Sequence, residues 1–170
     1  QAYGKAGRST QQTNIGGNIF NNFTDQDNSA TTETNLYVYS IPANTLSATG
    51  DAVILDFSST YIGSTSNKEF EMYISQNETY DTGAVNLAAG GTAQLRTRIT
   101  RTSSTTAEIE TQLQTTQATT FNYANHSDLA NLDFTTAILI NITGTASGVG
   151  AATGDITARS LIAKWEGGAL

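Results

Sequence analysis

The residues suited to chemistry are few, and the first to weigh is the single histidine, His126. A nucleophilic triad would need this histidine as its base, with a serine and a carboxylate around it. His126 lies in a polar stretch between predicted strands, Tyr123–Asn131, which we interpret as a loop. The chain has no G-x-S-x-G turn to present a serine. We therefore interpret His126 as an exposed loop histidine and not as a catalytic base.

Two pairs of glutamates have the spacing of residues that share one side of a β-strand. Glu69 and Glu71 form one pair, and Glu108 and Glu110 form the other. Two carboxylates on one face could serve a glycoside hydrolase as acid and base. Pairs at this spacing are nevertheless typical of solvated strand faces, and two arginines of the preceding predicted strand lie within reach of the second pair. We therefore predict a cross-strand ion-pair ladder there and no enzymatic activity.

Two loop motifs fail as ligand sites. Asp25–Asn28 begins like a calcium-binding loop, but the sixth position is Ala30 instead of glycine and the twelfth is Leu36 instead of glutamate. The glycines of Gly148–Gly154 lack the spacing and the following helix of a dinucleotide-binding loop. The chain has no cysteine, which excludes thiolate catalysis and zinc–cysteine sites. We expect neither a cofactor nor a metal ion.

The composition is that of one domain with a neutral, hydrogen-bonding surface. The 170 residues, 17.9 kDa, suffice for one core without a disulfide. The net charge of −7 disfavours a surface that follows nucleic-acid phosphates. Only 14% of residues are charged, so Thr, Ser, Asn and Gln supply most of the polarity. Because no apolar run reaches the roughly 18 residues of a membrane span, we expect a soluble chain with neither nucleic-acid nor membrane partners.

The first 33 residues differ from the rest in composition and in the spacing of their apolar residues. They are rich in Gln, Asn, Thr and Gly, and their larger apolar residues follow neither a helical nor a strand period. We interpret residues 1–33 as an extended N-terminal arm, although a disordered tail has the same composition. A solvated tail would rarely carry four large apolar side chains. These are the candidate partner contacts, Ile15, Ile19, Phe20 and Phe23.

From Thr34 onward, short β-branched and aromatic segments alternate with Gly, Asn, Asp and Ser, a pattern that predicts strands. In one of them Val53, Leu55 and Phe57 share a face, the period of two expected of a strand. We predict eight strands and no helix. They are Thr34–Ile41, Ala52–Tyr61, Lys68–Ser75, Thr79–Leu87, Thr92–Thr102, Thr105–Thr116, Phe134–Thr143 and Ile156–Trp165.

The number and spacing of these strands indicate the fold class. Eight strands without intervening helices leave a β-sandwich, a jelly roll or a barrel. We predict an all-β, eight-stranded jelly-roll sandwich over residues 34–170, with an immunoglobulin-like sandwich as the alternative. Phe134–Thr143 is apolar on both faces, so we expect it at the centre of a sheet or at a subunit contact.

The register of one hairpin can be predicted from its side chains. Paired residue numbers between the fifth and sixth strands must sum to an even value, because an odd sum would set Ile99 opposite Glu108 and split the apolar face. A three-residue loop, Thr102–Ser104, would then place Arg98 opposite Glu108. A five-residue loop, which places Arg98 opposite Glu110, is the alternative.

Five short motifs follow one another along the chain, and their order is similar to that in a known protein family. The longest is Tyr37–Asp51 (YVYSIPANTLSATGD), which resembles the opening of small jelly-roll domains of tailed bacteriophages, found in head-decoration proteins and in head- or tail-fibre tips. The family often has an aromatic residue before its arginine strand, where this chain has Gly90-Gly91-Thr92. The other four motifs are Lys68–Ile74 (KEFEMYI), Asp81–Leu87 (DTGAVNL), Ala93–Thr102 (AQLRTRITRT) and Arg159–Trp165 (RSLIAKW).

The resemblance implies a non-enzymatic structural protein located in the virion. It implies a jelly roll that assembles as a homotrimer, without catalytic residues. The partners would be further copies of the chain, together with a capsid or other virion protein held through the arm. Tyr37 and Tyr39 are candidates for surface or trimer contacts, alternating in the first strand with Leu36 and Val38.

Two other functions are compatible with the sequence. A carbohydrate-binding module could use tyrosines such as Tyr37 and Tyr39 as a stacking platform for a host glycan, whereas core packing is their ordinary role. A strand-donating pilin or fibre subunit could insert its arm into the next subunit. The assembly state distinguishes them, since a closed trimer favours a virion protein, a polymer favours a pilin and a glycan-binding monomer favours the module.

Overall fold

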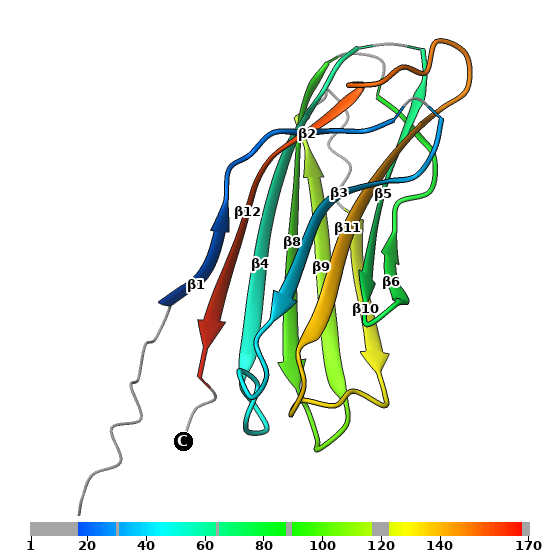
Figure 1. Cartoon of the computed structure of the whole chain (residues 1–170). Coiled ribbons are helices and arrows are strands. Elements are labelled where there is room, and N and C mark those ends of the chain that lie inside the picture. Colours follow the sequence, from blue (N-terminus) through cyan, green and yellow to red (C-terminus); the bar gives the residue numbers. More distant parts are fainter. Residues whose placement is uncertain (1–16, 30, 64, 88–89, 117–122, 168–170) are drawn as a thin grey trace, which may run out of the picture.

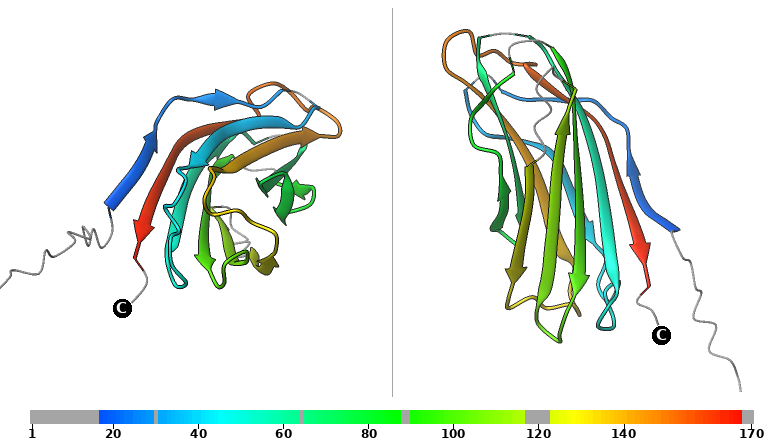
Figure 2. Two further views of the ribbon diagram at one scale, coloured as in Figure 1. Left: turned by 60° about the horizontal axis from the view of Figure 1, so that its bottom comes forward. Right: turned by 180° about the vertical axis from the view of Figure 1, so that it is seen from behind.

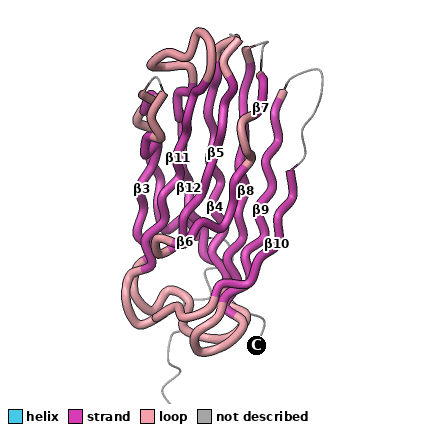
Figure 3. Tube along the Cα trace, turned by 90° about the vertical axis from the view of Figure 1, so that its right-hand side faces the viewer, coloured by secondary structure: helices cyan, strands magenta, loops and turns pink. Residues whose placement is uncertain are grey.

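Two antiparallel sheets pack face to face and enclose the core (Figure 1). The computed structural model describes residues 17–29, 31–63, 65–87, 90–116 and 123–167. Over these residues it contains twelve strands and no helix, and hence no helix of the length and hydrophobicity needed to cross a membrane. The strands run along the long axis, and the loops gather at its two ends (Figure 3). The prediction of an all-β sandwich is confirmed.

The larger sheet has seven strands in the described chain, in the order β1, β12, β4, β8, β9, β10, with β2 beside β12. All its pairs are antiparallel. The bounds are β1 (Gly17–Asn22), β2 (Gln26–Asp27), β4 (Ala52–Tyr61), β8 (Gly91–Arg101), β9 (Ala107–Thr115), β10 (Tyr123–Leu129) and β12 (Ile156–Glu166).

The smaller sheet has five strands, in the order β3, β11, β5, β6, with β7 also beside β5. Its bounds are β3 (Thr34–Ile41), β5 (Asn67–Ile74), β6 (Asn77–Asp81), β7 (Val85–Asn86) and β11 (Ile138–Ser147). β11 lies between β3 and β5. The central position predicted for its apolar sequence is confirmed. The strand begins at Ile138 rather than Phe134, because Asp133 accepts hydrogen bonds from Thr135 and forms a turn there.

The strand number predicted from the sequence was too small. The first two predicted strands match β3 and β4 residue for residue, but the predicted strand Thr79–Leu87 is two short strands, β6 and β7. Gly83 breaks it with a φ of 61°, and its N–H donates to the Asp81 carboxylate at 2.5 Å. β1, β2 and β10 were not predicted at all.

The core follows the period of two along the strands. Val53, Leu55 and Phe57 of β4 are at most 2% exposed and face the other sheet. The ring of Phe57 makes edge contacts with Tyr37 and with Phe70. Fully burying a side chain of this kind contributes about 1.5–3 kcal/mol, so these alternating residues hold the two sheets together.

The longest of the five motifs, Tyr37–Asp51, forms the end of β3 and the turn that leads to β4. Asn44 and Gly50 adopt positive φ, 62° and 93°, as tight turns require. The buried Asp51 carboxylate accepts a hydrogen bond from the Ala48 N–H at 2.7 Å, and Leu46 is 1% exposed. The motif residues therefore specify a turn and its anchor in the core.

The arm, as far as the structure describes it, belongs to the larger sheet. β1 pairs with β12, with a bulge between Asn18 and Phe20, and both views of Figure 2 show it alongside β12. The ring of Phe20 stacks on Tyr39 with centroids 4.4 Å apart. The interpretation of these residues as an arm without partners in its own domain is therefore wrong for Phe20. The bulge interrupts the alternation, which is why the sequence showed no strand period.

The other three candidate arm contacts have different outcomes. Ile19 and Phe23 are exposed, at 37% and 65%, and remain available to a partner. Ile15 lies outside the described residues.

Tyr37 and Tyr39 are not at the surface. They are 3% and 6% exposed and belong to the core. Burial raises the pKa of the Tyr39 hydroxyl to about 12. The alternation expected in β3 fails because a register shift opposite Ile142 points both Leu36 and Tyr37 inward. Val38, which is 51% exposed, is the outward residue.

The β8–β9 hairpin has the even register predicted from its side chains. Ile99 lies opposite Ile109 and Arg98 opposite Glu110, so the five-residue loop is correct and the three-residue loop is wrong. Thr102 N–H donates to the carbonyl of Thr106 at 2.9 Å, and the two hydroxyls share a hydrogen bond. These contacts close the longer loop.

Candidate functional site

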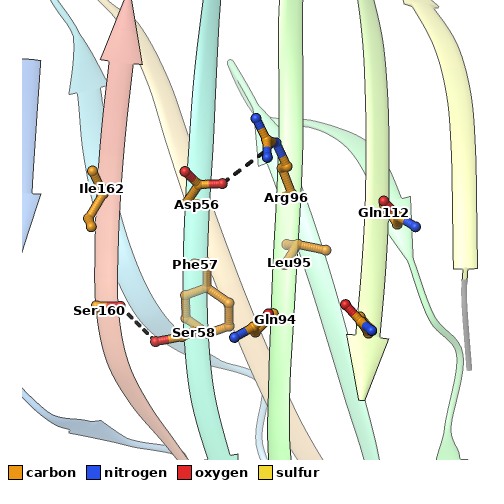
Figure 4. Close-up of a pocket in the computed structure, with 10 residues that line it drawn as sticks. Asp56, Phe57, Ser58, Gln94, Leu95, Arg96, Gln112, Ser160 and Ile162 are labelled. Atoms are coloured by element: carbon orange, nitrogen blue, oxygen red, sulfur yellow. Dashed lines mark hydrogen bonds and ion pairs between the residues drawn. The ribbon is translucent and has the colours of Figure 1, made fainter. Parts of the chain in front are cut away.

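The outward face of the larger sheet carries ordered rows of polar side chains. Antiparallel register places Ser160, Ser58, Gln94 and Gln114 side by side across β12, β4, β8 and β9. Two residues along, the next row is Ile162, Asp56, Arg96 and Gln112. Figure 4 shows side chains of both rows standing on the same face.

These two rows line a depression of about 380 Å³. A second depression of about 480 Å³ adjoins it towards β10, and both are lined by Arg96 and Gln112. We call the two together the polar groove. The other residues lining the second depression are Ile54, Arg98, Glu110, Thr111 and His126.

Hydrogen bonds and ion pairs keep part of the groove wall in place. Ser58 and Ser160 share a hydrogen bond of 2.6 Å between their hydroxyls. Lys164 Nζ donates to Asp56 Oδ2 at 2.7 Å. Both pairs cross from β4 to β12 and stiffen one wall.

Arg96 has the weakest contacts of the two arginines that line the groove. Its side chain is 63% exposed, and its only contact with an acid among the described residues is Nε to Asp56 Oδ1 at 3.7 Å, longer than a hydrogen bond. Arg98, by contrast, donates to Glu166 at 2.9 Å and to Thr100 at 3.2 Å. The donors of Arg96 therefore remain free for a ligand, beside the amide of Gln112. This arrangement can bind hydroxyl, carboxylate or phosphate oxygens in paired hydrogen bonds.

The structure corrects the prediction for His126. The stretch interpreted as a loop contains β10, where His126 lies opposite Glu110. His126 Nδ1 is 3.3 Å from Glu108 Oε1. Sequence reasoning missed this strand because its residues are polar, and pairing with β9 is what orders it. The predicted ladder from arginines to Glu108 and Glu110 does not form among the described residues, since Arg98 pairs with Glu166 instead.

A second group of carboxylates lies on the smaller sheet. Glu69, Glu71 and Asp81 have oxygens within 4.8 Å of one another. Burial, and next the nearby charge of Glu33, raise the pKa of Glu71 to about 7, although the Thr143 hydroxyl donates to it at 3.2 Å. The strand face that carries Glu69 and Glu71 was predicted to be solvated, but it is partly buried and its carboxylates repel one another.

This acidic group predicts a pH dependence of stability. Because the Glu71 pKa is about 7 in the folded state and near 4.5 as its ordinary value, the folded state holds a proton that the unfolded state has lost between these pH values. The free energy of unfolding should therefore fall as the pH rises from about 4.5 to 7. Glu71→Gln should remove this part of the fall and stabilise the protein at pH 8.

Urea unfolding at pH 5 and pH 8 measures the effect. Glu110→Gln, which removes one carboxylate from the other sheet, is the matched control. An equal loss of stability between the two pH values in wild type and in Glu71→Gln would contradict the prediction.

Comparisons with known proteins add one distant likeness of fold. The CBM2 module of the evolved Dit of Lactobacillus casei BL23 phage J-1 superposes with a TM-score of 0.37 at 9% identity, over 75% of this chain and 67% of that chain. No protein-family model and no curated protein matches the sequence. A similarity of this size carries no functional assignment, which rests instead on the residues of this chain.

Proposed function

We propose that this chain is a non-enzymatic domain displayed on the surface of a tailed-phage virion. This domain binds a host glycan through the polar groove. The ordered resemblance to phage jelly-roll proteins supports the virion assignment, and the motif residues serve the turns and core of a sandwich. Arg96, exposed and without a hydrogen bond from the described residues, supports binding through the groove.

Glycan is the favoured ligand because of the groove's chemistry. Three glutamine amides, Gln94, Gln112 and Gln114, supply both donors and acceptors beside Arg96, as a surface that recognises hydroxyl-rich ligands needs. The buried Tyr37 and Tyr39 cannot form the stacking platform considered from the sequence. Recognition would therefore depend on hydrogen bonds rather than on aromatic stacking.

We propose a homotrimer joined to a capsid or another virion protein through the N-terminal region, where the exposed Phe23 offers an apolar contact. Strand donation is disfavoured, because β1 already pairs with β12 of its own chain. Light scattering distinguishes these assemblies by mass.

Glycan binding predicts a clear effect of Arg96→Ala. Hydrogen bonds to charged groups contribute about 1.5–3 kcal/mol, so affinity for a bound bacterial polysaccharide should fall roughly 10- to 100-fold. Binding is measured first on an array of bacterial surface glycans and then by calorimetry with the glycan that binds best. Gln112→Ala should weaken the same interaction.

The control is Arg159→Ala, which removes the same charge from the same sheet outside the groove, where Arg159 pairs with Asp25. Circular dichroism verifies that each variant is folded. Failure of the wild-type protein to bind any glycan, or equal binding by Arg96→Ala, would contradict glycan recognition by the groove.

A further inference from the structure

Three potential metal ligands meet at the end of the polar groove that faces β10. Glu108 and Glu110 project from the same face of β9, and antiparallel register brings His126 of β10 opposite Glu110. Each of the three offers one ligand atom, and these atoms lie within 4.8 Å of one another. The backbone register alone creates this meeting, since the three residues come from two separate strands.

The spacing of these atoms is close to that of a coordination shell. In a tetrahedral zinc site the metal–nitrogen and metal–oxygen bonds are about 2.0–2.2 Å, which sets neighbouring ligand atoms roughly 3.3–3.6 Å apart. His126 Nδ1 and Glu108 Oε1 are 3.3 Å apart. Small side-chain rotations would bring the Glu110 oxygen to the same spacing, because all three side chains are at the surface.

The charge balance also favours a cation at this point. Glu110 has no ion pair or hydrogen bond from the described side chains, because the arginine opposite it, Arg98, pairs with Glu166. Of the two neighbouring carboxylates, only Glu108 is paired with the imidazole. A dication between them would neutralise their repulsion.

We propose that Glu108, Glu110 and His126 bind a divalent first-row transition cation, with Zn²⁺ as the representative ion. One imidazole nitrogen and two carboxylate oxygens suit Zn²⁺, whereas Ca²⁺ and Mg²⁺ prefer shells made of oxygen alone. The remaining coordination position faces solvent beside the groove. The site goes beyond the sequence expectation of no metal, which rested on the absence of cysteine and on the failure of the calcium-loop motif at Asp25–Asn28.

A metal ion at this site would add a side-chain link between the edge strand β10 and β9, which are already paired through their backbones. A ligand that binds only the folded state raises its stability in proportion to the logarithm of its concentration. Zn²⁺ should therefore raise the melting temperature of the wild-type protein, and this increase should disappear in His126→Gln. This effect does not depend on glycan binding, so it tests the metal site separately from the proposed function.

The experiment is a calorimetric titration of tag-free protein with Zn²⁺, followed by titration with Ca²⁺. We expect one Zn²⁺ per chain and weaker binding of Ca²⁺. Because the chain has a single histidine, the imidazole proton signals in NMR belong to His126 and should shift on Zn²⁺ addition. Affinity should fall at least about tenfold in His126→Gln and in Glu108→Gln.

Glu71→Gln is the matched control, because it removes a carboxylate from the acidic group on the smaller sheet. Retained Zn²⁺ affinity in this control, together with loss in His126→Gln, would support the site. Absence of Zn²⁺ binding, or binding that His126→Gln leaves unchanged, would overturn it. Loss of binding in Glu71→Gln alone would also overturn it and would place the ion on the smaller sheet.

Discussion

Deletion of residues 1–30 will lower the free energy of unfolding by about 3 kcal/mol or more, although the sequence indicated an extended arm there. The main reason is Asn28, which is 0% exposed. Its side-chain oxygen accepts a hydrogen bond from the Ile156 N–H at 2.8 Å, and its own N–H donates to the Ile156 carbonyl at 3.0 Å. The deletion leaves the N–H and the carbonyl of the buried Ile156 without these partners. Leaving a buried polar group unpaired costs about 1–3 kcal/mol.

Two further contacts disappear with the same deletion. The stacking of Phe20 on Tyr39 is lost, and the Tyr37 hydroxyl loses its acceptor, the Thr24 carbonyl, at 2.7 Å. Removal of β1 also exposes the edge of β12. Each loss adds to the cost of removing Asn28.

Urea denaturation followed by tyrosine and tryptophan fluorescence measures the change. Deletion of residues 1–16 is the control, because it leaves all of these contacts in place. The single variant Asn28→Ala should reproduce a large part of the effect, by about 2 kcal/mol. A melting temperature that hardly moves after deletion of residues 1–30 would restore the interpretation of this segment as a free arm.

The second large effect is expected at Asp155. This carboxylate is 1% exposed and accepts hydrogen bonds from Ser66 Oγ at 2.6 Å and from the Ala152 N–H at 3.2 Å. Ser66 in turn accepts from the buried Lys68 Nζ at 2.9 Å. Burial lowers the pKa of Lys68, and the charge of Asp155 opposes this shift. The network fastens the segment before β5 to the loop before β12.

Asp155→Ala should therefore destabilise the protein by about 3 kcal/mol, because it removes the charged acceptor of two hydrogen bonds and a negative charge close to the buried Lys68 ammonium. Asp155→Asn keeps the shape and part of the hydrogen bonding, so a smaller loss is expected. Asp56→Ala is the control. It removes the partner of Lys164 at the partly exposed face of the sheet, where an ion pair contributes about 0–1 kcal/mol.

Thermal and urea unfolding of the three variants give the comparison. Equal destabilisation by Asp155→Ala and Asp56→Ala would contradict the importance of the buried network. Because Asp155→Ala could prevent expression of folded protein, the Asn variant provides the measurable intermediate.

Several features of the fold could be predicted from local sequence. The alternation around Val53–Phe57 and the proline that follows Ile41 specified β4 and β3 to the residue. The parity of the β8–β9 register followed from keeping Ile99 with other apolar residues. These features depend on neighbours in the chain, on steric limits and on keeping one face of a strand apolar, so they are legible without a structure.

The sequence by itself thus determined an all-β sandwich, its buried strands and its turns, and tertiary structure decided the edges and the surface sites. β1 and β10 are polar or bulged segments, ordered by pairing with β12 and β9 rather than by their own periodicity. The contact of His126 with Glu108, and the absence of a close ion pair at Arg96, depend on which residues face each other across neighbouring strands. At these polar edges no apolar face fixes the register; it is set by bulges and by the packing of the whole sheet, which a local pattern of residues does not encode.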